Sequence, residues 1–363
     1  MLEIWRAGGA NTGADAATAQ AVEAEGWDGQ MFMDSQCLSA DPYAQMGVWA
    51  CSTERLMLST GVTNPLTRNL AVTAGSAATI QAISDGRAVL GIGRGDSALA
   101  YLGHSPVSAS RFETAIAQLQ ILLAGGEIPF AQFGSSGEAG SVHEMSLGAR
   151  PEAVRLSWLP AGLPKVPLDV AATGPKVIAM GALAAERLTF SVGAQAERLG
   201  WALEQAQRAR REQGLGDEGI SFGAQLVVVC NSHEEKAMEA AMQLAPPLAR
   251  FQIIEGKQVG PGSAEARRNL DAVKTGYDMT RHSETASNKK IRNGALSPDF
   301  VREFAVVGNP EQVTARLLDM MRMGLDRFVV VGPGVYPPGW SEEECGLFAQ
   351  EVIPALREGA RAR

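Results

Sequence analysis

The chain has 363 residues, of which 45% are hydrophobic and 20% are charged, as in an ordinary globular enzyme. Its formal net charge of −8, without a basic cluster, argues against a nucleic-acid partner. No apolar run is long enough to cross a bilayer, and the start MLEIWRAGG does not resemble a signal peptide. The four scattered cysteines lack metal-ligand spacing, which predicts reduced thiols, a cytoplasmic protein and no metal site.

Short apolar segments alternate with helical segments along the chain. We expect strands at residues 2–5, 29–33, 56–60, 88–92, 167–171, 188–191, 222–229 and 327–331. We expect helices at residues 15–25, 42–52, 70–84, 111–123, 175–185, 195–213, 233–244, 310–323 and 341–356, with the pair Pro246–Pro247 ending the one at 233–244. Eight strands with their helices predict a single (β/α)8 TIM barrel domain over residues 1–363. An open doubly wound sheet is the alternative.

Two stretches interrupt this alternation. Residues 124–164 are rich in Gly, Ser and Pro and show no period, which is typical of a functional loop or lid, although an insertion without function is the alternative. Residues 249–297 are charged and helical in pieces. We expect both to be large insertions near the C-terminal face of the barrel, where they would form the pocket for a small-molecule substrate.

One glycine-rich segment, GRAVLGIGRGDSALAYLG at residues 86–103, combines a predicted strand with a turn of small and polar residues. A buried strand leads into Gly91, Gly93 and Gly95, and Asp96 and Ser97 come next. Glycine allows positive φ and close approach of the backbone to a ligand. Because barrels do their chemistry at the C-terminal ends of their strands, the segment indicates a site, while a plain strand-to-helix turn is the alternative.

Polar and small residues follow other strands in the same way. Asp34 and Ser35 follow the strand at 29–33, and the run 61–64 (Gly61, Val62, Thr63, Asn64) follows the strand at 56–60. Asp34 and Asp96 could form the acid pair of a glycosidase, but 6% aromatic residues are too few for stacking sugars. Asp34 could equally be a structural carboxylate that accepts bonds from backbone N–H groups.

The turn Thr173-Gly174-Pro175-Lys176 precedes a predicted helix. The N-terminus of a helix binds anions through free N–H groups and the helix dipole. A small hydroxyl residue and a glycine let a phosphate approach, and Lys176 adds positive charge. Simple capping of the helix by Thr173 is the alternative.

Several motifs resemble the luciferase-like flavin-dependent oxidoreductases. They are DSQ at 34–36, STGVTNPLTRNLAVTA at 59–74, the segment 86–103, and ATGPK at 172–176, which is similar to the family's phosphate-binding turn. The chain looks most like the branch that contains methylenetetrahydromethanopterin reductase. The resemblance implies a TIM barrel enzyme whose reduced cofactor is FMN or the deazaflavin coenzyme F420. In the deazaflavin branch a non-prolyl cis peptide supports the ring, and the matching bond here is Gly61–Val62.

The resemblance also implies roles for the strand-end residues. It makes Asp96, Asp34 and Ser35 the candidate catalytic residues. The expected cofactor-binding residues are Gly61, Val62, Thr63, Asn64, Ser97, Thr173, Gly174, Pro175, Lys176 and Gly193. Many members carry histidine where this chain has Ser35, a poor general acid, so we expect Asp96 to handle the proton. The alternative is that Asp96 only caps the following helix.

The expected function is hydride transfer to or from a small organic substrate. One alternative is an FMNH2-dependent monooxygenase that uses dioxygen, with a separate flavin reductase as its partner. Another is a non-catalytic flavin-binding protein on the same barrel, because fold does not fix activity. The family resemblance further implies a symmetric homodimer, which we expect to form on the early helices at 43–50 and 70–84.

Overall fold

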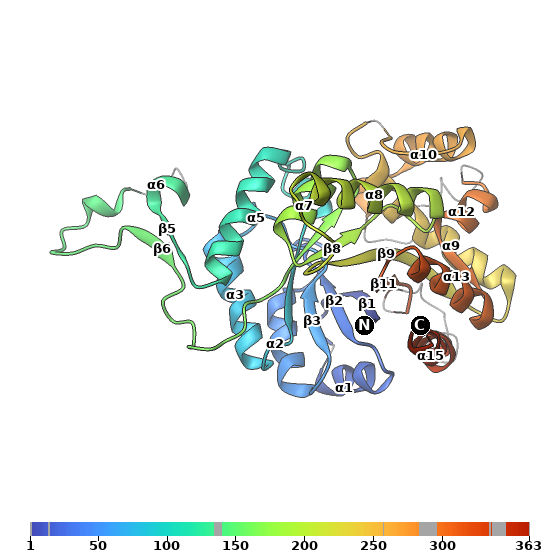
Figure 1. Ribbon diagram of the computed structural model, residues 1–363, viewed down its shortest axis with the longest axis horizontal. Coiled ribbons are helices and arrows are strands. Elements are labelled where there is room, and N and C mark those ends of the chain that lie inside the picture. Colours follow the sequence, from blue (N-terminus) through green and yellow to red (C-terminus); the bar gives the residue numbers. More distant parts are fainter. Residues whose placement is uncertain are drawn as a thin grey trace.

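Eight parallel strands close into a barrel in the computed structural model (Figure 1), which describes residues 2–13, 15–133, 140–256, 258–282, 296–333, 335 and 346–362. In order around the barrel they are β1 (Glu3–Gly9), β2 (Gly29–Met33), β3 (Met57–Thr60), β4 (Ala88–Ile92), β7 (Leu168–Ala172), β8 (Arg187–Phe190), β9 (Ser221–Cys230) and β11 (Arg327–Val331). The barrel closes because β8 pairs with β9, which itself pairs with β11 on its other side. The expected TIM barrel is confirmed.

A helix follows each barrel strand and covers its outer side. These helices are α1 (Ala16–Ala24), α2 (Pro42–Ser52), α3 (Leu70–Ile83), α5 (Ala109–Leu123), α7 (Pro175–Ala184), α8 (Ala196–Glu212), α13 (Pro310–Arg322) and α15 (Ile353–Arg361). Local chemistry sets several starts: the Asp41 and Asn309 side chains accept bonds from the first turns of α2 and α13, each with proline at its first position. Of the closing helix expected at 341–356, residues 341–345 lie outside the described part, and α15 continues to Arg361.

The second insertion is larger than expected. The helix α9 (Glu234–Ala249) runs through Pro246 and Pro247, where we expected it to end. Its buried alanine face packs with Phe300 and Phe304 of α12 (Pro298–Phe304) in a second apolar cluster, and this packing outweighs the two missing N–H donors. Thus α9 packs against Val227 and Val229 near the end of β9, and α13 comes next in the chain after the short strand β10 (Val306–Gly308).

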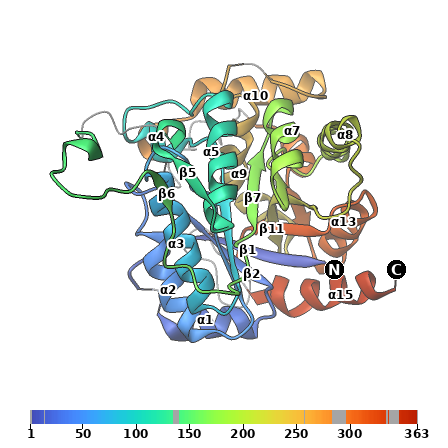
Figure 2. The ribbon, with the colours of Figure 1, turned by 60° about the vertical axis from the view of Figure 1, so that its left-hand side comes forward.

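We call residues 231–309 the upper lobe. Besides α9 and α12 it contains η2 (Arg250–Gln252), α10 (Ala264–Gly276), η3 (Met279–Arg281) and β10 (Val306–Gly308), which extends the sheet beside the last residues of β9. The lobe joins the end of β9 to the start of α13, so it stands on the C-terminal face of the barrel, as expected. Figures 1 and 2 both show α10 beyond the barrel at this end.

The first insertion lies elsewhere than we expected. It joins the end of α5 to the start of β7 and therefore leaves from the N-terminal ends of the strands. It contains an antiparallel hairpin of β5 (Glu127–Pro129) and β6 (Ala153–Arg155), with short helices α6 (Phe130–Phe133) and η1 (Val142–Glu144). Figure 1 shows this arm projecting sideways past α3 and α5. The expectation of a lid near the C-terminal face is wrong for this segment.

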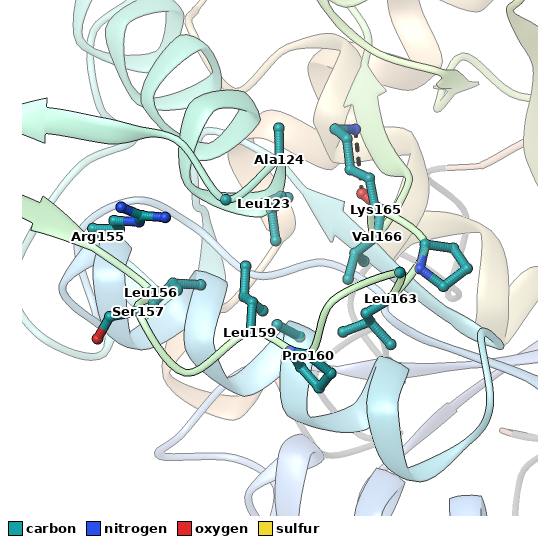
Figure 3. A pocket seen from close by; sticks show the side chains of 14 residues that line it. Leu123, Ala124, Arg155, Leu156, Ser157, Leu159, Pro160, Leu163, Lys165 and Val166 are labelled. Carbon is teal, nitrogen blue, oxygen red and sulfur yellow. Dashed lines mark hydrogen bonds between the residues drawn. The ribbon is translucent and has the colours of Figure 1, made fainter.

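A cavity of about 280 Å³ lies where the arm returns to the barrel (Figure 3). Leu123, Leu156, Leu159 and Leu163 line it, and Lys165 at its edge pairs with Glu186 at 2.7 Å. The cavity lies at the C-terminal end of α5 and beside the segment that precedes β7, away from the C-terminal strand ends. None of the candidate site residues lines it.

The barrel interior is closed toward its N-terminal end. There Arg187 and Arg327 face Asp169, and the Arg187 guanidinium also pairs with Glu3 and lies over the Trp5 ring. Above them an apolar layer formed by Trp5, Ala7, Met31, Val89, Val329 and Val331 fills the centre. A ligand can therefore enter from the C-terminal face. Among the described helices, none combines the length and apolar character needed to span a membrane.

Candidate active site

The third strand ends in the feature that the resemblance predicted. The Gly61–Val62 peptide bond is cis, and this prediction is confirmed. The Gly61 N–H donates to the carbonyl of Phe32 at 2.6 Å, and a Cβ at Gly61 would lie 2.8 Å from the Cβ of Met31. The chain then rejoins β4 through Thr63, whose N–H donates to the carbonyl of Gly91 at 3.0 Å. The bulge thus sits at the barrel mouth between β2 and β4.

Asp34, at the end of β2, is held by an arginine. Arg68 Nη1 contacts Asp34 Oδ2 at 2.5 Å, and its Nη2 contacts Asp41 Oδ2 at 2.8 Å. The guanidinium also lies over the Tyr43 ring, 5.1 Å from the ring centre. Burial and the nearby Asp34 carboxylate raise the pKa of Tyr43 well above its ordinary value. The Arg68 guanidinium therefore joins the Asp34 and Asp41 carboxylates.

Several buried polar atoms near the ends of β2 and β3 have no hydrogen-bond partner among the described residues, the Thr63 hydroxyl among them. Two of them are Asp34 Oδ1, on a side chain with no exposed surface, and Asn64 Nδ2. The other side of the Asn64 amide is used, because Oδ1 accepts the N–H groups of Leu66 and Thr67 at 3.0 Å each. A buried acceptor and a buried donor left open at neighbouring strand ends are suited to a polar ligand.

The loops after β2 and β4 meet through two predicted site residues. The hydroxyls of Ser35 and Ser97 lie 3.1 Å apart, and Gln36 Nε2 donates to the carbonyl of Ala98 at 3.0 Å. These contacts bring the second and fourth strand ends together across the bulge of the third. Catalytic roles for Ser35 and Asp34 stay predictions.

Asp96 makes an ion pair that links it to the upper lobe. It stands before the short helix α4 (Ser97–Ala100), yet its side chain accepts no bond from that helix. Its Oδ2 instead contacts Nη2 of Arg250, at the junction of α9 and η2. The alternative of a side-chain cap is therefore not realised.

Arg250 lies in an aromatic setting. The guanidinium lies 4.7 Å from the ring centre of Phe251 and 5.4 Å from that of Tyr277. Burial lowers the pKa of Arg250 to about 10, which leaves it a cation at neutral pH. The Tyr277 hydroxyl meets Nδ1 of His282 at 2.5 Å. Burial, with Arg250 nearby, lowers the pKa of His282 to about 4.

The turn at residues 173–176 leads into a helix that no side chain caps. Gly174 is the N-cap of α7 and Pro175 follows as its first residue, so no side chain caps the helix. The Thr173 hydroxyl donates to the carbonyl of Ser191 at 3.3 Å, so the capping role of Thr173 is not realised. A Cβ at Gly174 would meet no atom within 4 Å, and Lys176 is exposed. The N–H groups of the first turn are open to an anion.

Gly193 has a structural reason to be glycine. Its φ is +80°, and a Cβ there would lie 2.6 Å from the ring of Phe304. Gln252 Nε2 of the upper lobe donates to the carbonyl of Val192 beside it at 2.8 Å. Cofactor binding by Gly193 stays a prediction. Within the described residues, no group of three or more His, Cys, Asp and Glu side chains could hold a metal ion.

The partners of the two carboxylates, Arg68 and Arg250, were not predicted from the sequence. Arg68 lies in the motif at 59–74, and a cation between two acidic loops could have been proposed from its position after the third strand. Arg250 gave no such signal, because 154 residues separate it from Asp96. A third arginine at the mouth is also paired, because Arg94 contacts Glu255.

Comparison with known proteins defines the class. The family model described as luciferase-like monooxygenase matches residues 7–327. The chain belongs to this family, and it is an oxidoreductase. It is similar to 5,10-methylenetetrahydromethanopterin reductase from Methanolobus tindarius, with 23% identity over 339 residues that cover 92% of this chain and 94% of the relative.

Solved structures agree with the fold over nearly the whole chain. The F420-dependent tetrahydromethanopterin reductase from Methanopyrus kandleri aligns with a TM-score of 0.71 and 19% identity, covering 98% of this chain and 99% of the other. An F420-dependent secondary alcohol dehydrogenase, solved with an F420-acetone adduct, aligns with a TM-score of 0.71 and 17% identity over the same shares. Several monooxygenases align with TM-scores of 0.57 to 0.63.

Proposed function

We propose that this oxidoreductase uses coenzyme F420 to transfer a hydride to or from a small organic substrate. The observation that carries the proposal is the arrangement of open polar groups at the mouth. Asp34 Oδ1 and Asn64 Nδ2 are buried without partners near β2 and β3, and the uncapped start of α7 follows β7. F420 is preferred over FMN because the F420-dependent structures align with TM-scores of 0.71, against 0.57 to 0.63 for the monooxygenases.

The residues present fit such a cofactor. The first turn of α7 and Lys176 would hold its phosphate, because that helix start offers N–H groups and open space. Asp34 and Asn64 would accept and donate one hydrogen bond each at the edge of the polar ring. When bound, reduced F420 supplies a hydride, and the protein supplies orientation and exclusion of water.

Asp96 is the proposed proton-handling group. Its Oδ2 is paired with Arg250, whereas no described donor is bonded to Oδ1. Oδ1 would exchange the proton that balances the hydride on the substrate, and Ser97 beside it would help to hold the loop through Ser35. A positioned carboxylate of this kind accelerates reactions about 10²- to 10⁴-fold.

The absorption spectrum of the purified protein after incubation with F420 or FMN tests this proposal. We expect F420 to bind and FMN to bind more weakly. Reoxidation of reduced F420 under argon would then be followed with acetone and with methylenetetrahydromethanopterin, the compounds named for the similar proteins. Binding of FMN alone, with no hydride transfer from F420, would contradict the assignment.

The family description favours one second candidate, an FMNH2-dependent monooxygenase. That activity needs dioxygen and a supply of reduced FMN, which a separate flavin reductase would provide. Oxygen uptake that depends on FMNH2 and on an added organic compound would establish it. A protein that binds a flavin but turns over under neither condition would be a non-catalytic binding protein.

We further propose a cytoplasmic homodimer. Val48 on α2, and Val72 and Ile83 on α3, are large apolar side chains that are 46 to 55% exposed. The helices α2 and α3 pack against each other, and they are the helices on which we expected the dimer to form. The exposed thiols of Cys37 and Cys51 suit a reducing compartment. Light scattering at micromolar concentration should give twice the chain mass, and a monomer would contradict the proposal.

A further inference from the structure

Three contacts join the loop between β4 and α5 to the upper lobe. Asp96 pairs with Arg250, and Arg94 pairs with Glu255 in the opposite sense of charge. In addition, the Tyr101 hydroxyl donates to the carbonyl of Met279 at 2.9 Å. The loop that carries the proposed proton-handling group is therefore fastened to residues that lie more than 150 positions further along the chain.

The two ion pairs differ in their surroundings. The side chains of Arg250 and Asp96 are 8% and 15% exposed, whereas Glu255 is 62% exposed. Water screens an exposed pair, so the Arg94–Glu255 contact contributes little. At the buried pair, removal of one partner leaves the other charge without compensation, so a change there should have a larger effect than one at the exposed pair.

The Arg250 guanidinium is fixed independently of Asp96. It also contacts the carbonyl of Pro247, in the last turn of α9, and it stacks on Phe251 and Tyr277. These contacts tie its direction to the upper lobe. Arg250 therefore presents a donor at a set position, rather than following a mobile carboxylate.

The loop of Asp96, by contrast, does little to orient its side chain. Gly95 before it has a φ of +83°, and the Asp96 carboxylate accepts no bond from α4. Among the described residues, Arg250 is its recorded partner. The direction of the carboxylate is thus decided by the upper lobe and not by the barrel.

We propose that Arg250 is a positioning residue for Asp96, so that docking of the upper lobe presents the Asp96 carboxylate at the mouth. This inference rests on the proposed function, in which Asp96 Oδ1 exchanges a proton with the substrate. Arg250 touches no reacting atom; it acts by holding Oδ2 and so leaving Oδ1 free. The barrel alone binds the cofactor, while the proton-transfer group becomes competent only with the lobe in place.

The test compares Arg250→Met and Arg250→Lys with Glu255→Gln, which removes the exposed pair at the same junction. We would measure kcat and KM for reoxidation of reduced F420 under argon, using whichever acceptor the wild type accepts, acetone or methylenetetrahydromethanopterin. The dissociation constant of F420 and the Tm would be measured for each variant. Arg250→Lys keeps the charge and guards against a variant that fails to fold.

We expect Arg250→Met to lower kcat about 100-fold and Arg250→Lys about tenfold, with the F420 dissociation constant changed less than threefold. Glu255→Gln should leave kcat within twofold of wild type. Equal losses of kcat in Arg250→Lys and Glu255→Gln, or an effect of Arg250→Lys on Tm alone, would overturn the positioning role. Absence of turnover by the wild type with both acceptors would instead defeat the proposed function.

Discussion

Two carboxylates at the same barrel mouth are held in different ways. Asp34 is paired with Arg68, 34 residues away and next to the neighbouring strand, so the contact forms as soon as two adjacent βα units pack. Asp96 is paired with Arg250, 154 residues away in the upper lobe. The first pair belongs to the barrel itself, whereas the second exists only when an insertion docks on it.

The different settings of Asp34 and Asp96 suit different roles. Asp34 has no exposed side-chain surface and keeps one oxygen open, which fits a fixed acceptor for a bound ring. Asp96 is partly exposed and is oriented from outside its own loop, which fits a group that exchanges a proton with a transient substrate. Changes to the first pair should act on folding and cofactor affinity, and changes to the second should act on turnover.

The largest effect is expected from Arg68→Met. It would leave Asp34 as a buried anion without a cation, at a cost of about 3–5 kcal/mol in the free energy of unfolding. Denaturant unfolding measures this, and Arg322→Met is the matched control, because Arg322 forms an exposed pair with Asp319. The control should change stability by less than about 0.5 kcal/mol. Equal effects of the two changes would show that Asp34 is not held as a buried charge.

Asp96→Asn comes next and tests the other pair. If Asp96 Oδ1 carries the proton, kcat should fall roughly 100-fold or more. The Tm should fall as well, because Arg250 would remain buried without its anion. The double variant Asp96→Asn with Arg250→Met should recover the Tm but not kcat. Full turnover in Asp96→Asn would make Asp96 structural.

A smaller effect concerns the pH dependence of stability, which we expect to arise from His282 in the upper lobe. Burial and Arg250 lower the pKa of His282 from 6.5 to about 4, so between these values the unfolded chain binds a proton that the folded chain does not. Stability should therefore fall as the pH is lowered through this window, by roughly 3 kcal/mol. His282→Gln should remove that part of the loss, and the exposed His104→Gln should not. Identical pH profiles for both variants would contradict this assignment.

The smallest effect is expected at the start of α7, which follows the strand β7. In Gly174→Leu the new side chain meets no protein atom within 4 Å of its Cβ, so the Tm should stay within about 2 °C of wild type. It would stand where a phosphate approaches α7, and the F420 dissociation constant should rise roughly tenfold. Gly148→Leu, also in open space but on the arm, is the control. Unchanged affinity would leave residues 173–176 without a phosphate role.

The barrel could be predicted because its signals are local. Apolar strands such as 88–92 and 327–331, together with capping residues such as Asp41 and Asn309, act over a few positions. The Gly61–Val62 cis bond was predicted through a family motif that is continuous in sequence. Strand ends in a parallel barrel share one face, so Asp34, Asn64, Asp96 and Thr173 could be assigned to the mouth from their order alone.

Tertiary structure decided what depends on distant packing. The sequence by itself determined the barrel, the glycine turns and the polar residues at the mouth, because each follows from spacing and local backbone chemistry. The N-terminal position of the first insertion follows from the order of the elements, because the segment joins a helix to the next strand. The sequence could not carry α9 through Pro246, since that outcome depends on which apolar faces meet. It also could not pair Asp96 with Arg250, because a single ion pair over 154 residues leaves no periodic signal. Only the folded chain brings that cation to that carboxylate.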